Sequence, residues 1–301
     1  MGANPGHYSV MADEMERYLF GEGDPVPQGA YCDCTAGAGG YAQRILRRVD
    51  RCQLIAIDRD GEALQRCRAR LSEFGNRVKY FHGGFSKLAQ AAKGCLPLAG
   101  IVADLGLSRL QIEDGDRGFS LRKSGPLDMR FDSRQTLQAD ELVNRRSERD
   151  LADTLYSLAD ERFSRRIARA LVQARPIRDT AHLSDVVAAA VPRRAASRVH
   201  PATKTFQALR MAVNDELGEL GKLLAEVPRL LAPGGRFVVL SFHSGEDRMV
   251  KQSFRQLAAA GVYRLLTRRV VRPTEAEVQR NPASRSARLR AVQRTELAYS
   301  Y

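Results

Sequence analysis

Acidic residues end three apolar segments in the first third of the chain. Asp33, Asp58 and Asp104 each follow a short apolar run, a pattern typical of buried strands in a parallel sheet. Ligands of such sheets bind beyond the carboxyl ends of the strands, where we expect these carboxylates. An acid at the end of the second strand normally accepts hydrogen bonds from ribose hydroxyls. Asp58 therefore predicts a nucleoside ligand.

A glycine-rich turn separates the first strand from the next helical pattern. Gly37, Gly39 and Gly40 lack the Cβ atoms that would keep a ligand away from the backbone, and they tolerate positive φ. The helix that follows offers unpaired N–H groups at its start. The spacing is neither the G-x-G-x-x-G dinucleotide fingerprint nor a phosphate-binding Walker loop. Asp33, just before the turn, disfavours a pyrophosphate and suits a cationic or zwitterionic ligand such as S-adenosylmethionine.

Phe85 falls at the end of the third predicted strand. An aromatic ring there fits stacking on a purine, and it fits a core position equally well. The glycine turn or one acid alone would also fit an ordinary doubly wound turn, since short glycine motifs often match by chance. Asp58, Phe85 and Asp104 at successive strand ends together predict a composite pocket.

The order of the patterns predicts an α/β fold interrupted by helices. Strand and helix patterns alternate in residues 1–110, which we predict to be the first part of the core. Residues 111–200 are predicted to form an insertion, a wrapping loop followed by helices over 139–144, 148–158, 161–172 and 180–190. Residues 201–301 complete the core, with one long helix over 206–231, a late strand over 263–271 and a basic C-terminal tail.

The charge balance favours a polyanionic partner. The formal net charge is +13, although a merely basic soluble enzyme would also fit this value. Arg165 and Arg166 belong to a helical stripe of arginines, and Arg285 and Arg288 lie in the basic tail. Each group fits either contact with RNA phosphates or a solvated surface.

The cysteines indicate a reducing compartment, and the N-terminal sequence bears on targeting. The five cysteines are an odd number, and the spacing of Cys32 and Cys34 is neither C-x-x-C nor that of a zinc site, so no metal is predicted. Residues 1–9 lack the charged and apolar parts of a signal peptide, and no apolar run is long enough to span a membrane. We expect a cytoplasmic protein.

Several sequence blocks, taken in order, point to one known family. They are residues 33–40, 56–60, 104–108, 117–120, 125–130, 161–168, 205–210, 214–217 and 241–244. The glycine turn is common to many methyltransferases, whereas the Gly-Pro-Leu-Asp-Met-Arg block at 125–130 and the order of all blocks are highly specific. In these blocks the chain resembles the bacterial small-subunit ribosomal RNA cytosine-N4 methyltransferases of the RsmH (formerly MraW) type. The resemblance covers nearly the whole length.

The resemblance implies a class I, Rossmann-like methyltransferase fold with an all-helical insertion. It implies methyl transfer from S-adenosylmethionine to N4 of a cytidine in the decoding region of 16S ribosomal RNA, within the small ribosomal subunit. Family cofactor contacts fall on positions matching Gly39, Gly40, Tyr41, Asp58, Phe85, Asp104 and Gln111. Tyr41 and Gln111 rest on the resemblance alone, whereas the other five also follow from the strand-end pattern or the turn.

The chain departs from the family pattern at three positions. Tyr41 stands where the family usually has His, Arg109 lies within a usual Ser-Ser-x-Gln block, and Gly245 replaces a usual Leu. Arg109 adds positive charge near the expected pocket. Together with Arg130, Arg165, Arg166, Arg285 and Arg288, it is a candidate RNA contact.

The chemistry implied by the resemblance needs a positioned hydrogen-bond acceptor, because the lone pair of the cytosine amine is delocalised into the ring. We hypothesise that Asp104 lies at the junction of cofactor and cytosine, and that Asp128 and His243 help to position the base. His243 also fits a purely structural hydrogen bond. A methyltransferase for another RNA or a small molecule, or an inactive RNA-binding assembly factor, remain alternatives, and a homodimer is a further expectation.

Overall fold

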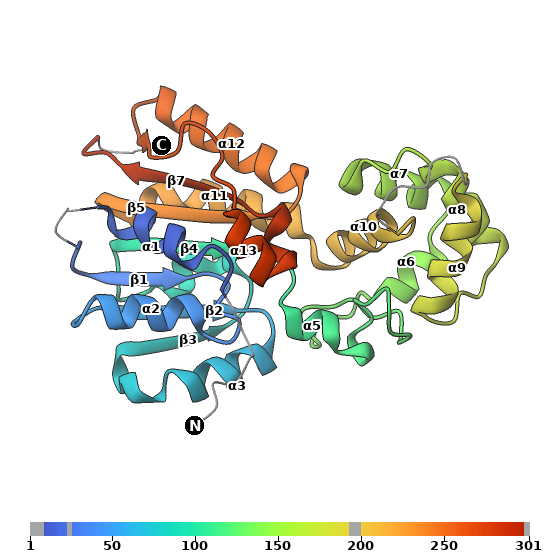
Figure 1. The fold of residues 1–301 in the computed structure, drawn as a ribbon, viewed down its shortest axis with the longest axis horizontal. Coiled ribbons are helices and arrows are strands. Elements are labelled where there is room, and N and C mark those ends of the chain that lie inside the picture. The colour runs from blue at the N-terminus through green and yellow to red at the C-terminus, as the bar shows by residue number, and fades with distance from the viewer. Residues whose placement is uncertain (1–8, 23–25, 193–199, 298–301) are drawn as a thin grey trace. The chain divides into compact units, whose positions relative to one another are not determined.

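The computed structural model describes residues 9–22, 26–192 and 200–297. The chain forms two compact units (Figure 1). We call residues Met1–Gly106 and Gly218–Tyr301 the sheet unit, and residues Leu107–Leu217 the helical unit.

The sheet unit is built on a mixed seven-stranded sheet with the order β3-β2-β1-β4-β5-β7-β6 (Figure 1). Strands β1 to β5 are parallel, and β7 runs antiparallel to both β5 and β6. The bounds are β1 Ala30–Asp33, β2 Gln53–Asp58, β3 Val78–His82, β4 Leu98–Asp104, β5 Leu231–Ser241, β6 Tyr263–Leu265 and β7 Arg288–Arg294.

Helices cover both faces of this sheet, because alternate residues of each strand point to opposite sides. Tyr31 packs in one core cluster with α1 and α2, and its neighbour Cys32 packs in the other with α4, α11 and α12. The helices are α1 Ala12–Phe20, α2 Gly40–Arg48, α3 Gly61–Arg70, α4 Leu88–Ala91, α11 Glu216–Leu230, α12 Ser244–Ala259 and α13 Glu275–Arg280. Every residue of β1 is buried, as expected for a central parallel strand.

The helical unit has its own apolar core, to which Leu155, Ile167, Leu183 and Leu209 contribute. Its helices are α5 Arg109–Glu113, α6 Ala139–Arg145, α7 Glu148–Ala159, α8 Ser164–Gln173, α9 Thr180–Ala190 and α10 Thr203–Asn214. Side-chain caps begin α7 and α9, where Ser147 and Asp179 accept backbone N–H groups of the first turn. The four helices predicted between residues 139 and 190 are therefore present.

The single helix predicted over residues 206–231 is wrong. Two helices, α10 and α11, meet at Asp215, whose φ of 48° is left-handed and ends α10. Aspartate tolerates this conformation better than most residues, so the continuous apolar periodicity concealed the break. Since α10 belongs to the helical unit, that unit extends beyond the predicted insertion of residues 111–200.

The C-terminal residues also differ from expectation. The predicted late strand over 263–271 is only β6, followed by an isolated bridge from Val271 to Leu289. The segment described as a basic tail contains β7, which pairs with β5 inside the sheet. Its arginines suggested a solvated segment, because an arginine is buried only where it has a partner. These partners are distant in sequence: Arg290 pairs with Asp247 at 2.6 Å, and Arg294 donates to the carbonyl of Pro228. Across the described part of the chain, no helix is both long and apolar enough to cross a membrane.

Candidate active site

The glycine turn joins β1 to α2 and also contacts the end of β2. Gly37 and Gly39 are left-handed, with φ of 52° and 83°. The Gly37 N–H donates to Oδ2 of Asp58 at 2.7 Å, which fixes the turn against the second strand. A Cβ on Gly40 would overlap Oγ of Ser9, so any side chain there would require this hydroxyl to shift. The turn requires glycine for both backbone conformation and close approach.

Asp58 is held by backbone donors through both carboxylate oxygens. Oδ2 accepts from Gly37, and Oδ1 accepts the N–H of Asp60 at 2.9 Å. Burial nevertheless raises the pKa of Asp58 to about 6, against the lowering effect of these hydrogen bonds. A carboxylate oxygen can accept more than one hydrogen bond, so ribose hydroxyls can still donate to it.

Asp33 ends β1 and is completely buried. Its Oδ1 accepts the N–H of Thr35 at 3.1 Å, whereas Oδ2 has no hydrogen-bond partner among the described residues. Burial raises the pKa of Asp33 to about 7 and the charge of Asp58 adds to this shift, whereas the backbone N–H groups of Thr35 and Ala42 oppose it. A buried carboxylate oxygen without a donor is costly, and a cationic ligand would relieve that cost.

Asp104 ends β4 and is held at two points by residues of the β1–α2 segment. Its backbone N–H donates to Oγ1 of Thr35 at 2.7 Å, and its Oδ2 accepts from the Tyr41 hydroxyl at 3.1 Å. Its Oδ1 is buried and has no partner within the described ranges. Burial raises the pKa of Asp104 to about 7; the Tyr41 hydrogen bond opposes this shift, and the charges of Asp33 and Glu246 add to it.

Two further predicted residues of the sheet unit lie near strand ends. Phe85 begins a short 3-10 turn after β3 and packs, half-buried, on the core cluster that contains α4. His243 caps the start of α12: its Nδ1 accepts the N–H of Glu246 at 3.3 Å, and the Glu246 carboxylate accepts the N–H groups of Phe242 and His243. The contacts of His243 are those of a structural cap.

The arrangement in the sheet unit fits S-adenosylmethionine. Asp33 and Asp104 each present one buried, unpartnered carboxylate oxygen, as far as the described residues go. The charge of Asp58 raises the pKa of Asp33, and the charge of Asp33 raises the pKa of Asp104. A nucleoside with a positive sulfonium and an ammonium group offers the positive charge that both carboxylates lack, and its ammonium group can donate to Asp33. The Cβ positions of Gly39 and Gly40 face Cys67 and Ser9 of the chain itself, so contact of the cofactor with these glycines stays a prediction.

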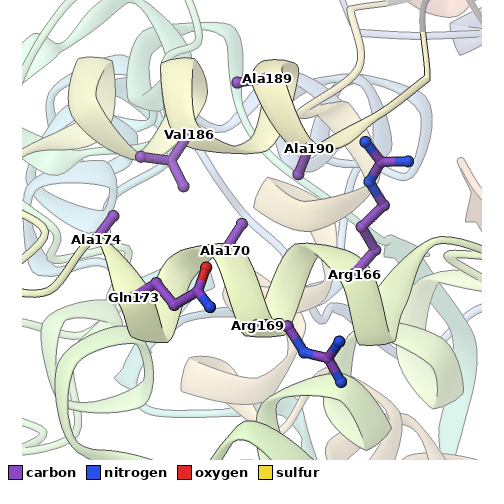
Figure 2. A pocket seen from close by; sticks show the side chains of 8 residues that line it. All are labelled: Arg166, Arg169, Ala170, Gln173, Ala174, Val186, Ala189 and Ala190. Carbon is purple, nitrogen blue, oxygen red and sulfur yellow. The ribbon is translucent and has the colours of Figure 1, made fainter.

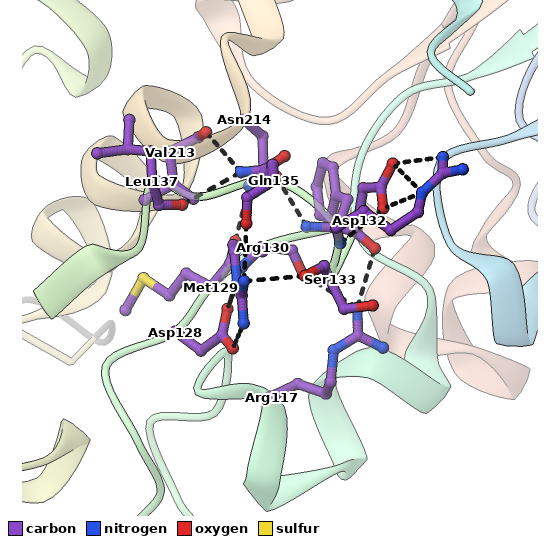
Figure 3. Close-up of polar contacts among 12 residues, drawn as sticks. Arg117, Asp128, Met129, Arg130, Asp132, Ser133, Gln135, Leu137, Val213 and Asn214 are labelled. Atoms are coloured by element: carbon purple, nitrogen blue, oxygen red, sulfur yellow. Dashed lines mark hydrogen bonds and ion pairs between the residues drawn. The ribbon is translucent and has the colours of Figure 1, made fainter. Parts of the chain in front are cut away.

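Asp128 and Arg130 lie in the helical unit and bind each other (Figure 3). Arg130 donates from Nε and Nη2 to the two oxygens of Asp128 at 2.7 and 2.8 Å, and from Nη1 to the carbonyls of Ser133 and Gln135. Although burial opposes it, the Arg130 hydrogen bonds hold the pKa of Asp128 below its ordinary value. This geometry favours a structural role for both residues, and their roles in positioning the base and binding RNA stay predictions.

Asn214 fastens the same segment, and the sequence patterns did not single it out as a site residue. Its completely buried side chain donates to the carbonyl of Met129 (Figure 3). It also donates to the carbonyl of Arg210 and accepts the N–H of Phe131 at 2.8 Å. Thr35 was missed in the same way. Both are short polar side chains inside matching blocks, and only the fold shows which distant backbone groups they reach.

The other candidates in the helical unit lie on its helices. Gln111 and Ser108 form a capping box at the start of α5, and the cofactor contact of Gln111 stays a prediction. Arg109 is exposed and pairs with Glu113 at 2.6 Å. Arg165 and Arg166 are exposed on α8.

A groove of about 500 Å³ runs between α8 and α9 (Figure 2). Small side chains such as Ala170 and Ala190 line it, and Arg166, Arg169 and Gln173 contribute polar groups from α8 (Figure 2). Arg169 also pairs with Glu148 at 3.3 Å, but both side chains are largely exposed.

The two arginines of the predicted tail have separate environments in the sheet unit. Arg285 is exposed in a 3-10 turn. Arg288 begins β7 opposite Ser241, the last residue of β5, so it lies at the same sheet edge as the end of β4. Its Nη1 is buried and has no partner in the described structure.

Comparison with known proteins gives one consistent family. The profile of the MraW methylase family matches residues 4–295. Ribosomal RNA small subunit methyltransferase H of Solibacter usitatus is 49% identical over 269 residues, covering 89% of this chain and 93% of that protein. The protein of the same name from Koribacter versatilis is 50% identical over 300 residues, covering 96% and 94%. A solved putative rRNA methylase of Clostridium thermocellum has a TM-score of 0.46 and 9% identity, covering 95% of this chain and 94% of that one.

Proposed function

Because this chain belongs to the MraW methylase family, we propose that it methylates the N4 amine of a cytidine in the decoding region of 16S ribosomal RNA. As a member of that family it is an S-adenosylmethionine-dependent methyltransferase with the class I, Rossmann-like fold predicted from its sequence. The observation that carries the proposal is the pair of buried carboxylate oxygens, on Asp33 and Asp104, that lack partners in the described structure beside the glycine turn.

The proposed cofactor site uses the strand ends of the sheet unit. Asp58 would accept the ribose hydroxyls, Phe85 would contact the adenine, and Gly39, Gly40 and the backbone of Tyr41 would line the amino-acid side. S-adenosylmethionine, when bound, supplies a methyl group on a positive sulfur. The buried acids would compensate that charge in a site of low dielectric.

Asp104 is the proposed acceptor for the cytosine amine. Its Oδ2 is held by Tyr41, which leaves the buried Oδ1 to accept an N4–H hydrogen bond and to assist proton loss. Orienting the amine nitrogen toward the methyl group supplies most of the rate gain, because the two reactants are held in one geometry. Asp128 is less suited to accept the proton, since Arg130 stabilises its ionised form.

The proposed RNA contacts are basic groups of both units. Arg165 and Arg166 are exposed on α8. The groove between α8 and α9 would receive an unpaired nucleotide beside Arg166 (Figure 2). Arg288 lies at the sheet edge where β5 ends, and it would contact a phosphate next to the target base. The target cytidine must be unstacked, since a paired amine is out of reach.

Mass spectrometry of 16S RNA from cells that lack the protein tests this function. We expect one N4-methyl group on cytidine to disappear, to return with the wild-type gene, and to stay absent with Asp104→Ala. A full set of methyl groups in the deletion strain would overturn the proposal. If the methyl group does disappear, methylation assays on small subunits and on free RNA would show whether the substrate is the RNA within the subunit or free RNA. A cytoplasmic location and a homodimer stay predictions.

A further inference from the structure

Tyr41 occupies an unusual position between Asp104 and the N-terminal segment. Its buried hydroxyl lies 2.6 Å from the carbonyl oxygen of Val10 and 3.1 Å from Oδ2 of Asp104. A phenol has one proton, so it cannot fully donate to both acceptors at once. The two acceptors therefore compete for Tyr41 whenever Asp104 is ionised.

The competition disappears when Asp104 carries a proton. The carboxyl group can then donate to the Tyr41 oxygen, while Tyr41 donates to Val10, and all three groups are satisfied. Deprotonation of Asp104 draws the Tyr41 proton toward Oδ2 and leaves the Val10 carbonyl without that donor. Protonation of the carboxyl group is thus coupled through Tyr41 to the N-terminal segment.

The segment on the other side of Tyr41 is held in place and lies over the glycine turn. Ser9 contacts Gly40 closely enough to exclude a Cβ there. The N–H of Met11 donates to Oε1 of the buried Glu277 at 2.6 Å. Met11 is completely buried, and its backbone is left-handed with φ of 51°. We call residues Ser9, Val10 and Met11 the strap. It is held by contacts with Gly40 and Tyr41 on one side and by the hydrogen bond to Glu277 on the other.

Tyr41 also explains why the two oxygens of Asp104 differ. Thr35 holds the backbone N–H of Asp104 and Tyr41 holds Oδ2, while Oδ1 has no partner in the described residues. One oxygen is therefore anchored, and the other is buried without a partner among these residues. Rotation of the carboxyl group would exchange them, and the Tyr41 hydrogen bond opposes that rotation.

We propose that Tyr41 is a positioning residue that anchors Oδ2 of Asp104, presents Oδ1 to the reacting amine, and couples the charge of this carboxyl group to the strap over the glycine turn. This inference rests on the proposed function, because it requires Asp104 to act in methyl transfer. It replaces a direct side-chain contact between Tyr41 and the cofactor. The reaction itself gains no new step.

The test compares Tyr41→Phe with Tyr31→Phe. Tyr31 is a matched control: it is completely buried, and its hydroxyl donates to the carbonyl of Pro27 at 2.6 Å, with no hydrogen bond to Asp104 among those of the described residues. The measurements are the pH profiles of kcat and kcat/KM on small ribosomal subunits. Loss of the donor to ionised Asp104 should move the acid limb of Tyr41→Phe to higher pH by about one unit, with activity recovering at high pH. Tyr31→Phe should keep the wild-type limb.

An unchanged acid limb in Tyr41→Phe, or an equal displacement in Tyr31→Phe, would overturn the inference. If Tyr41→Phe does not fold, 3-fluorotyrosine placed at position 41 gives the opposite test: it is a stronger donor, so the limb should move to lower pH. Asp104→Asn separates this inference from the proposed function. If Asp104→Asn is fully active, Asp104 has no role in methyl transfer. If Asp104→Asn is inactive but the acid limb of Tyr41→Phe does not move, only the role of Tyr41 is rejected.

Discussion

Gly37 donates its backbone N–H to the Asp58 carboxylate at 2.7 Å, and this bond ties the turn after β1 to the end of β2. The turn is thereby shaped before any ligand arrives, and it lies beside three carboxyl groups whose pKa values are raised. Preorganisation of this kind lowers the ordering cost of binding. Its consequences can be measured in the cofactor affinity and in the stability of the free protein.

Cofactor affinity should increase as pH rises from about 6 to about 8. The pKa values of Asp33 and Asp104 are raised to about 7 and that of Asp58 to about 6, so the free site holds protons that a cationic ligand displaces. Titration calorimetry in buffers of different ionisation enthalpy would count the released protons. Affinity that is constant or falls over this interval would contradict the assignment of these acids to the site.

The same acids should make the free protein less stable as pH rises. A carboxyl group with a raised pKa in the folded state binds more protons when folded, so its contribution is fully present below the unfolded value of about 4 and is lost as pH passes through the folded value. We expect the Tm of the free protein to fall between about pH 4 and 7, and the stabilisation by S-adenosylmethionine to grow over that interval. Asp104→Asn should flatten part of both trends. Unaltered trends in this variant would exclude Asp104 as a contributor.

Replacement of Gly40 by Ala should weaken cofactor binding. The new Cβ would overlap Oγ of Ser9, so the Ser9 side chain, the strap or the turn must shift. We expect at least about a tenfold loss of affinity, equivalent to about 1.4 kcal/mol. Gly221→Ala is the matched control, because nothing lies within 4 Å of its added Cβ and its place in α11 favours Ala. The double change with Ser9→Gly should recover part of the affinity, and no recovery would show that the strap is not the obstacle.

The sequence predicted the parts of this site whose positions follow from local patterns. Asp33, Asp58 and Asp104 end apolar strands, and the glycine turn is evident from its composition, so the positions of these residues at the strand ends followed from local patterns; that they bind the cofactor stays a prediction. The contacts of Thr35, Tyr41 and Asn214 could not, because each reaches a group distant in sequence: Asn214 and Met129 are 85 residues apart. β7 was missed for a related reason, since only its partners show that Arg290 and Arg294 are buried.

Loss of the Arg130 side chain should destabilise the helical unit. Arg130→Ala would leave the partly buried Asp128 without its bidentate partner and two carbonyls without donors. We expect a cost of about 2 to 4 kcal/mol in the free energy of unfolding. Arg134→Ala is the control, because the Arg134–Asp132 pair is closer to solvent, with the Arg134 side chain 57% exposed, and should cost less than about 1 kcal/mol. Equal losses in denaturant unfolding would show that Arg130 contributes no more than a surface pair.

Charge reversal on α8 should separate RNA binding from cofactor binding. Arg165→Glu with Arg166→Glu replaces two exposed cations by anions, so phosphate contacts are lost while the core side of α8, with Ile167 and Leu171, is unchanged. We expect RNA affinity to fall about tenfold or more and the salt dependence of binding to weaken, because fewer counterions are released.

Arg149→Glu on α7 is the control: this side chain is 91% exposed and lies outside the groove between α8 and α9. Calorimetry with S-adenosylmethionine should give the wild-type affinity in all variants. Parallel loss of RNA and cofactor binding would indicate misfolding, and an equal effect of Arg149→Glu would mean that the protein binds RNA through net charge alone.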